Sequence, residues 1–213
     1  MITVARTRSA LLSAYDKTGV EDLAQGLTDL GWNILASSGT RKYLVEKGVE
    51  SRDVADLVGE PILDHRVVTL SRKIHAGLLA RNNLDDLAEL KRIDAPFIDL
   101  VFVDLYPLQD EISKADRTLR SVIDKTDIGG PTLLRAAAKG RRLVLCNPNQ
   151  ISGILNYLRV SATVGSAEKH ESLVSALVAQ AEFLVADYCR ASALFHQGVT
   201  GEQIREYLGS ATS

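Results

Sequence analysis

The sequence has few cysteines, no long apolar run and no excess of charge of one sign, and each shortage excludes a class of protein. Its 213 residues include two cysteines, Cys146 and Cys189, whose spacing gives no disulfide framework and predicts a reduced, intracellular setting. The N-terminus is a poor secretory signal, and no run of about 20 apolar residues predicts a transmembrane helix. A formal net charge of -2 argues against a protein that coats nucleic acid or an acidic membrane. We therefore expect a soluble, cytoplasmic protein that binds neither.

Motifs for metal, covalent and dinucleotide chemistry are also missing. The four histidines show no H-x-x-x-H spacing, and no cysteine pairs with them. The sequence contains no G-x-S-x-G, no G-x-x-x-x-G-K-[ST] and no G-x-G-x-x-G. We therefore expect no metal and no cofactor, which leaves acid–base and electrostatic catalysis.

Apolar runs that alternate with helical patterns predict an α/β fold. Hydrophobic residues make up 46% of the chain, enough for a real core. Because strands that alternate with helices are joined by right-handed crossovers, the sheet is predicted to be mostly parallel and flanked by helices. The expected strands are residues 10–15, 32–37, 96–108 and 142–147, and the first two helices are expected within 19–31 and 39–48.

A helical extension is predicted after this α/β part. Residues 171–198 have apolar residues at helical intervals and are expected to form a long helix that packs on the sheet or on a partner subunit. Residues 161–171 are polar and predict a loop before that helix. We therefore divide the chain into an α/β domain at residues 1–150 and a C-terminal helical extension at residues 151–213.

Ligands of an α/β sheet usually bind where strands end and helices begin, and this rule selects four segments. SAYDKTG (13–19) and ASSGT (36–40) combine hydroxyls, a lysine and backbone N–H groups at predicted helix starts. Such groups cradle phosphates, although Ser and Thr also cap helices without any ligand. DLYP (104–107) places Tyr106 at a strand end, where a phenol can stabilise developing negative charge or bond to a structural partner.

The fourth segment, DKTDIGGPTLLRAAAKGRR, begins with an acid and paired glycines and ends in basic residues. The glycines let backbone approach a ligand closely. A straight helix from Pro131 to Lys139 rises about 12 Å, so Lys139 and Asp127 could meet only across a bound molecule or through a bend. A surface helix with cations near its C-terminus explains the basic end but not the Asp-Ile-Gly-Gly start.

A charged run at residues 64–77 is a further candidate. Solvation of a surface explains most such runs, whereas the functional reading is an arginine that reaches a phosphate.

Taken in order, SAYDKTG, ASSGTRKYL, HRVVTLSRKIHAGLLAR, DLYPL and DIGGPTLLRAAAKG resemble the inosine monophosphate (IMP) cyclohydrolase domain of the bifunctional purine-biosynthesis protein. The likeness covers roughly residues 9–200 and implies a fold similar to that of methylglyoxal synthase. It implies closure of the purine ring of a 5-formamidoimidazole-4-carboxamide ribonucleotide with loss of water, no cofactor, and a homodimer. The formyltransferase domain of that bifunctional protein has no counterpart in this sequence.

The resemblance also implies roles for individual residues. Asp127 would orient or deprotonate the carboxamide, Lys139 would help to transfer the proton, and Tyr106 would stabilise charge on oxygen. The backbone of Ile128 and Gly129 would face the base. The residues implied to hold the nucleotide, chiefly its phosphate, are Ser13, Lys17, Ser37, Ser38, Gly39, Thr40, Arg66 and Thr69.

Two positions depart from the family pattern, and several hypotheses therefore stay open. Val68 stands where the family has a lysine that polarises the formyl oxygen, and Ser38 stands where it has a glycine. The chain is then a slower cyclohydrolase, in which Arg72 or Lys73 replaces the lysine, or a paralogue retuned to a related purine-like nucleotide in a specialised nucleoside pathway. Two more hypotheses are a non-catalytic nucleotide-binding regulatory domain and a methylglyoxal-synthase-like lyase.

Overall fold

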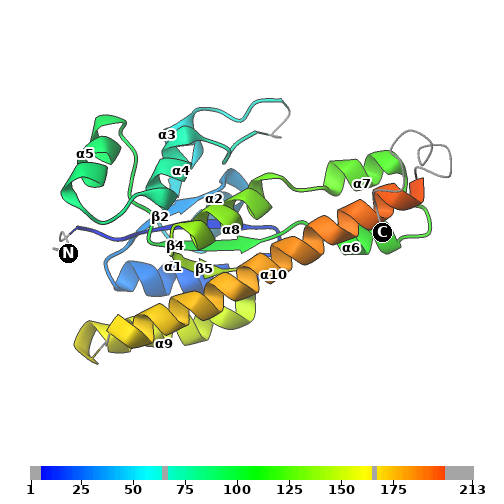
Figure 1. The fold of residues 1–213 in the computed structure, drawn as a ribbon. Coiled ribbons are helices and arrows are strands. Elements are labelled where there is room, and N and C mark those ends of the chain that lie inside the picture. The colour runs from blue at the N-terminus through cyan, green and yellow to red at the C-terminus, as the bar shows by residue number, and fades with distance from the viewer. Residues whose placement is uncertain (1–5, 64–66, 165–166, 200–213) are drawn as a thin grey trace.

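The structure, a computed structural model, describes residues 6–63, 67–164 and 167–199. Its centre is a five-stranded sheet in the order β3-β2-β1-β4-β5, in which every pair of neighbouring strands is parallel. This arrangement, flanked by helices (Figure 1), confirms the α/β fold predicted from the sequence. The strands are β1 (Ser9–Ala14), β2 (Asn33–Ala36), β3 (Arg52–Asp53), β4 (Leu100–Asp104) and β5 (Leu143–Leu145).

Helices cover both faces of this sheet. Figure 1 shows α1 and α9 on one face and α4 and α8 on the other, while α10 runs along the β5 side against α8 and β5. The helices are α1 (Val20–Asp29), α2 (Ser38–Glu46), α3 (Ala55–Val58), α4 (Arg72–Leu79), α5 (Leu84–Arg92), α6 (Leu108–Ser113), α7 (Leu119–Lys125), α8 (Gly129–Lys139), α9 (Ile151–Val164) and α10 (Ala167–Val199), with a 3-10 turn at Pro148–Gln150.

The two central strands, β1 and β4, bring distant parts of the chain together. Ala10 pairs with Leu100 and Ala14 pairs with Asp104, so both strands end at the same level. Their side chains are almost all buried, because a parallel strand between two layers of helices has no solvent face. The loops that follow β1 and β4 therefore begin side by side.

The polar stretch at residues 161–171 was expected to be a loop, and this prediction was wrong. α9 continues to Val164 and α10 already begins at Ala167. The polar residues that open α10, Glu168 to Glu171, are exposed. A helix can carry such residues wherever it faces water, so polarity alone did not indicate a loop.

By length and composition, α10 is also apolar enough to cross a membrane, although the sequence predicted no such segment. Packing accounts for part of this apolar character, since 28% of the apolar window is buried. Val174, Leu177, Ala181 and Val185, spaced three or four residues apart, are buried in the same core cluster as β1 and β4.

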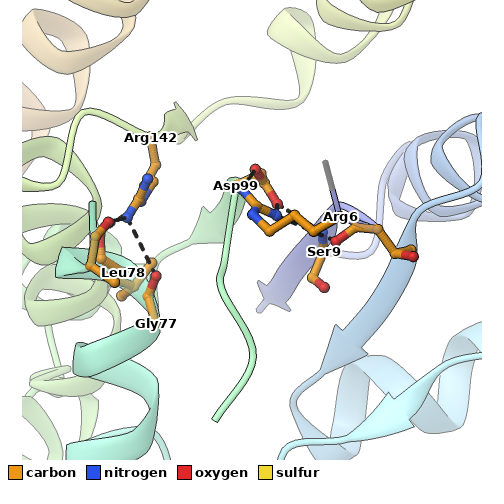
Figure 2. Close-up of polar contacts among 8 residues, drawn as sticks. Arg6, Ser9, Gly77, Leu78, Asp99 and Arg142 are labelled. Atoms are coloured by element: carbon orange, nitrogen blue, oxygen red, sulfur yellow. Dashed lines mark hydrogen bonds and ion pairs between the residues drawn. The ribbon is translucent and has the colours of Figure 1, made fainter. Parts of the chain in front are cut away.

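At the amino-terminal edge of the sheet, Arg142 ties β5 to the end of α4 (Figure 2). Its guanidinium donates hydrogen bonds to the carbonyl oxygens of Leu78 at 2.7 Å, Gly77 at 3.5 Å, and Ala80. Carbonyls in the last turn of a helix lack intrahelical partners, and Arg142 supplies them. The same guanidinium lies 4.0 Å from the ring centre of Phe97.

Arg6 makes a second tie at this edge. It pairs with Asp99 at 2.5 Å, and the same carboxylate accepts a hydrogen bond from the backbone N–H of Ser9 at 2.9 Å (Figure 2). Arg6 also lies 3.6 Å from the ring centre of Phe97, so this ring contacts two arginines. These contacts fix the amino ends of the strands and leave the carboxyl ends free for a site.

Candidate active site

The carboxyl-terminal edge of the sheet contains the topological switch point of the fold. From β1 the chain moves outward to β2 and β3, and it then returns to the other side of β1 to form β4. At such a switch point the loops leave neighbouring strands in opposite directions, and doubly wound sheets usually bind their ligands there. The segment after β1 contains Lys17, and the segment after β4 contains Tyr106.

A cluster of hydroxyls and a lysine lies at the ends of β1 and β2. Thr40 is fully buried, and its Oγ1 accepts hydrogen bonds from the Ala14 N–H and the Ser37 hydroxyl, both at 3.1 Å. The Lys17 ammonium donates to the carbonyl oxygens of Ala14 and, at 3.1 Å, of Tyr15. These groups adjoin the first turn of α2, and backbone N–H groups at the start of a helix can bind an anion. We call Lys17, Ser37 and Thr40 the cradle.

Burial lowers the pKa of the Lys17 ammonium, while the carboxylates of Asp104 and Asp16 act in the opposite direction. The Lys17 ammonium is thus partly removed from water and lies against the carbonyl groups at the end of β1. A bound phosphate would restore the interactions that this burial removes.

The other residues predicted for the nucleotide take varied positions. The exposed Ser38 donates a hydrogen bond to Asp53 at 3.0 Å, so its side chain is turned toward β3. Gly39 is exposed, and a Cβ built there would contact nothing within 4 Å. Ser13 is half-buried in β1, and Arg66 lies outside the described residues.

Asp127 lies at the start of α8, beside the loop that follows β4. Its Oδ1 accepts a hydrogen bond from the Gly130 N–H at 3.1 Å. A Cβ at Gly130 would collide with Asp127 Oδ2 and lie 2.5 Å from Leu105, whereas one at Gly129 would lie 2.8 Å from the Thr69 hydroxyl. The two glycines therefore allow Asp127, Thr69 and the β4 loop to meet.

Desolvation raises the pKa of the Asp127 carboxyl, although hydrogen bonds from the N–H groups of Gly130 and Gly129 act in the opposite direction. A carboxylate whose affinity for protons is raised by burial is a suitable general base. Asp127 therefore combines a raised pKa with a position at the switch point of the sheet.

The remaining predicted residues divide between the two ends of α8. Ile128, which is exposed, adjoins Asp127, and Tyr106 follows Leu105 in the β4 loop. Lys139 is the exposed last residue of α8, about 15 Å along the helix axis from Gly129. Its catalytic role stays a prediction, since within one chain it lies far from Asp127.

Four residues at this edge were not singled out from the sequence: Tyr15, Asp104, Lys125 and Tyr188. Asp104 ends β4, and its Oδ2 accepts a hydrogen bond from the Asp16 N–H at 2.8 Å. Burial raises the pKa of its carboxyl. An acid at the end of a strongly apolar strand was a usable signal, whereas Tyr188 belongs to α10 and gave none.

Tyr188 holds the linker between α7 and α8. Its hydroxyl accepts a hydrogen bond from the Asp127 N–H at 2.6 Å and donates one to the Lys125 carbonyl at 3.2 Å. Burial raises the pKa of this phenol to about 12, so it keeps its proton and makes both bonds. The long C-terminal helix thereby positions Asp127.

Replacing Tyr188 with phenylalanine is expected to lower the free energy of unfolding by about 1–3 kcal/mol, because two backbone groups lose their partner. Turnover should fall as well, since Asp127 would no longer be fixed. Denaturant titration measures the first effect. Tyr157→Phe is the matched control, because that hydroxyl bonds to the exposed His170 at 2.8 Å. Equal stability of the two variants would contradict the positioning role.

Two hollows lie in the described surface. One, of about 750 Å³, lies between the α6–α7 connection and the end of α10, and the other, of about 530 Å³, lies beside Phe183 and Arg135. Neither is lined by a residue predicted for the site. The candidate site is instead the carboxyl-terminal edge of the sheet, where the cradle and Asp127 lie.

Comparison with known proteins agrees with this fold. Residues 19–132, more than half of the chain, match the model of the MGS-like domain, so the chain belongs to the family of MGS-like domains. The matched region includes most of the cradle, Thr69, Tyr106 and Asp127.

Among solved structures, the chain is similar to the crystal structure of ForH. The two share 32% sequence identity and superpose with a TM-score of 0.75, over 90% of this chain and 100% of that chain. Both findings confirm the methylglyoxal-synthase-like fold that the resemblance implied, and they favour an enzyme.

Proposed function

We propose that this protein closes the purine ring of a 5-formamidoimidazole-4-carboxamide ribonucleotide, giving IMP and water. One observation carries the proposal: the half-buried Asp127 carboxylate shares the carboxyl-terminal edge of the sheet with the cradle formed by Lys17, Ser37 and Thr40. A ribonucleotide whose phosphate occupies the cradle would direct its base toward Asp127 and Tyr106.

The reaction needs a proton acceptor at the base and a donor for the departing oxygen. In the first step the carboxamide nitrogen attacks the formyl carbon, a C–N bond forms, and an N–H proton moves to the former formyl oxygen. In the second step the resulting hydroxyl leaves as water with the proton of the formamide nitrogen, and a C=N bond closes the ring. Asp127, whose pKa is raised by burial, can accept the carboxamide proton in the first step and pass it to the former formyl oxygen.

The adduct carries partial negative charge on oxygen, which the protein must stabilise. Tyr106 directly follows Leu105 in the sequence. The Leu105 and Asp127 side chains both contact Gly130. We expect the Tyr106 hydroxyl, which belongs to an exposed side chain, to donate a hydrogen bond to that oxygen.

Position 68 favours a second candidate function. Val68 is half-buried and packs against the core, so it supplies no charge to the reacting oxygen. The Lys73 ammonium pairs with the Asp94 carboxylate, with Nζ 3.7 Å from Oδ2. Arg72 is exposed at the start of α4. The same site could therefore be retuned to cyclise a related purine-like nucleotide whose reacting oxygen needs less stabilisation.

An absorbance assay with the formamido imidazole carboxamide ribonucleotide tests the proposal. Turnover by the wild-type protein is expected, and Val68→Lys should raise kcat by up to about a hundredfold if a missing cation limits the rate. An analogue with a different five-membered nitrogen ring serves as the comparison substrate. Faster turnover of the analogue would support the second candidate, and no turnover of either substrate by either protein would contradict cyclisation.

A further inference from the structure

Two tyrosine rings meet just beyond the carboxyl ends of β1 and β4. Tyr15 and Tyr106 have ring centres 5.1 Å apart with an angle of 57° between the ring planes, and each residue is 46% exposed. The hydrogen bond from the Tyr15 N–H to the Asp104 carbonyl, at 3.2 Å, fixes the two loops against each other. Half of each ring is thus free to contact a ligand at the switch point.

Lys125 adds a positive charge to this pair. Its ammonium lies 5.6 Å from the ring centre of Tyr15 and 5.9 Å from that of Tyr106, within the range of cation–π attraction. The Lys125 carbonyl accepts the hydrogen bond from Tyr188, so its backbone is held by the same contact that fixes Asp127. The cation therefore has a defined position beside both rings.

The pair adjoins the cradle directly. The Lys17 ammonium donates a hydrogen bond to the Tyr15 carbonyl, so the cradle and the aromatic ring lie on the same short loop after β1. Tyr106 directly follows Leu105, and the Leu105 and Asp127 side chains both lie against Gly130. A molecule with an anionic group at one end and a planar ring at the other matches this order of groups.

We propose that Tyr15, Tyr106 and Lys125 form a wall that binds the planar heterocycle of a nucleotide. The half-exposed ring faces provide stacking surface, and the ammonium attracts oxygen atoms at the edge of the heterocycle. This wall rests on the function proposed above and assigns binding residues, Tyr15 and Lys125, that the resemblance did not imply.

Calorimetric titration with IMP and with ribose 5-phosphate separates the wall from the cradle. Tyr15→Leu and Lys125→Met should each raise the Kd for IMP by about tenfold, while the Kd for ribose 5-phosphate, which has no base, changes less than about twofold. Tyr15→Phe and Lys125→Arg should stay within about threefold of the wild-type protein, because they keep the ring and the cation.

Lys47→Met is the matched control, since Lys47 lies 5.6 Å from the Tyr43 ring at the end of α2 and should not affect IMP binding. Unchanged IMP binding in Tyr15→Leu and Lys125→Met, equal loss of both ligands, or a wild-type protein that does not bind IMP would each overturn the wall. The calorimetric test measures binding and not turnover. A protein that binds IMP through the wall but does not produce IMP would therefore overturn the proposed function and leave the wall standing.

Discussion

Replacing Asp127 with asparagine is expected to lower kcat by roughly 10²- to 10⁴-fold, because the amide cannot accept the carboxamide proton. The asparagine oxygen can still accept the hydrogen bond that Gly130 donates to Asp127, so the start of α8 should keep its structure. Initial rates measured by absorbance test this result. Asp124→Asn is the control, because this exposed carboxylate interacts with Arg120 at the surface. A kcat within threefold of the wild-type value would rule out Asp127 as the base.

The same substitution has an expected effect on stability that depends on pH. Burial raises the pKa of Asp127 above its ordinary value of 3.8, so the folded protein binds this proton more tightly than the unfolded chain. The contribution to the free energy of unfolding is full below the unfolded pKa and is lost as pH rises through the folded pKa. Asp127→Asn should therefore raise Tm at neutral pH, and the gain should disappear in acid. A constant difference in Tm across this range would contradict the raised pKa.

Replacing Arg142 with alanine is expected to lower the free energy of unfolding by about 3 kcal/mol, because the carbonyl groups at the end of α4 would lose their donor. Burial lowers the pKa of this guanidinium to about 10, so it is still cationic at neutral pH. Arg142→Lys should recover only part of the loss, since an ammonium does not reproduce the planar fork of donors.

Arg135→Ala is the control for the loss of stability expected in Arg142→Ala. Arg135 is exposed and pairs with Glu182 on the surface, so its loss should cost at most about 1 kcal/mol. Urea titration of the two variants gives both free energies. Similar values for Arg142→Ala and Arg135→Ala would contradict the anchoring role of Arg142.

The sequence predicted the strands that are buried on both faces and missed the one that is not. β1, β4 and β5 are mostly apolar, which is the pattern that two covering layers of helices impose. β3 has two residues, Arg52 and Asp53, at the edge of the sheet, and such a strand leaves no periodic pattern. Boundaries were also broad, since the run predicted at residues 96–108 forms a strand only at Leu100–Asp104.

The site was predictable where its residues are close in sequence. Asp127 and its two glycines form one local motif, and the hydrogen bond within that motif explains the pattern. The meeting of Tyr15 with Tyr106 depends instead on β1 pairing with β4, which follows from the strand order rather than from local pattern. Tyr188 reaches the site only through the packing of α10, and long-range packing of this kind has no local signature.

The hydrogen bonds between Tyr188 and the α7–α8 linker make the site depend on α10, which follows every strand in the chain. A nascent chain leaves the ribosome from its N-terminus, and all five strands precede α10. The Asp127 N–H and the Lys125 carbonyl therefore gain their partner, the Tyr188 hydroxyl, only after α10 has been synthesised. The same helix buries Val174, Leu177, Ala181 and Val185 in the core around the sheet, so it completes the core and the site together.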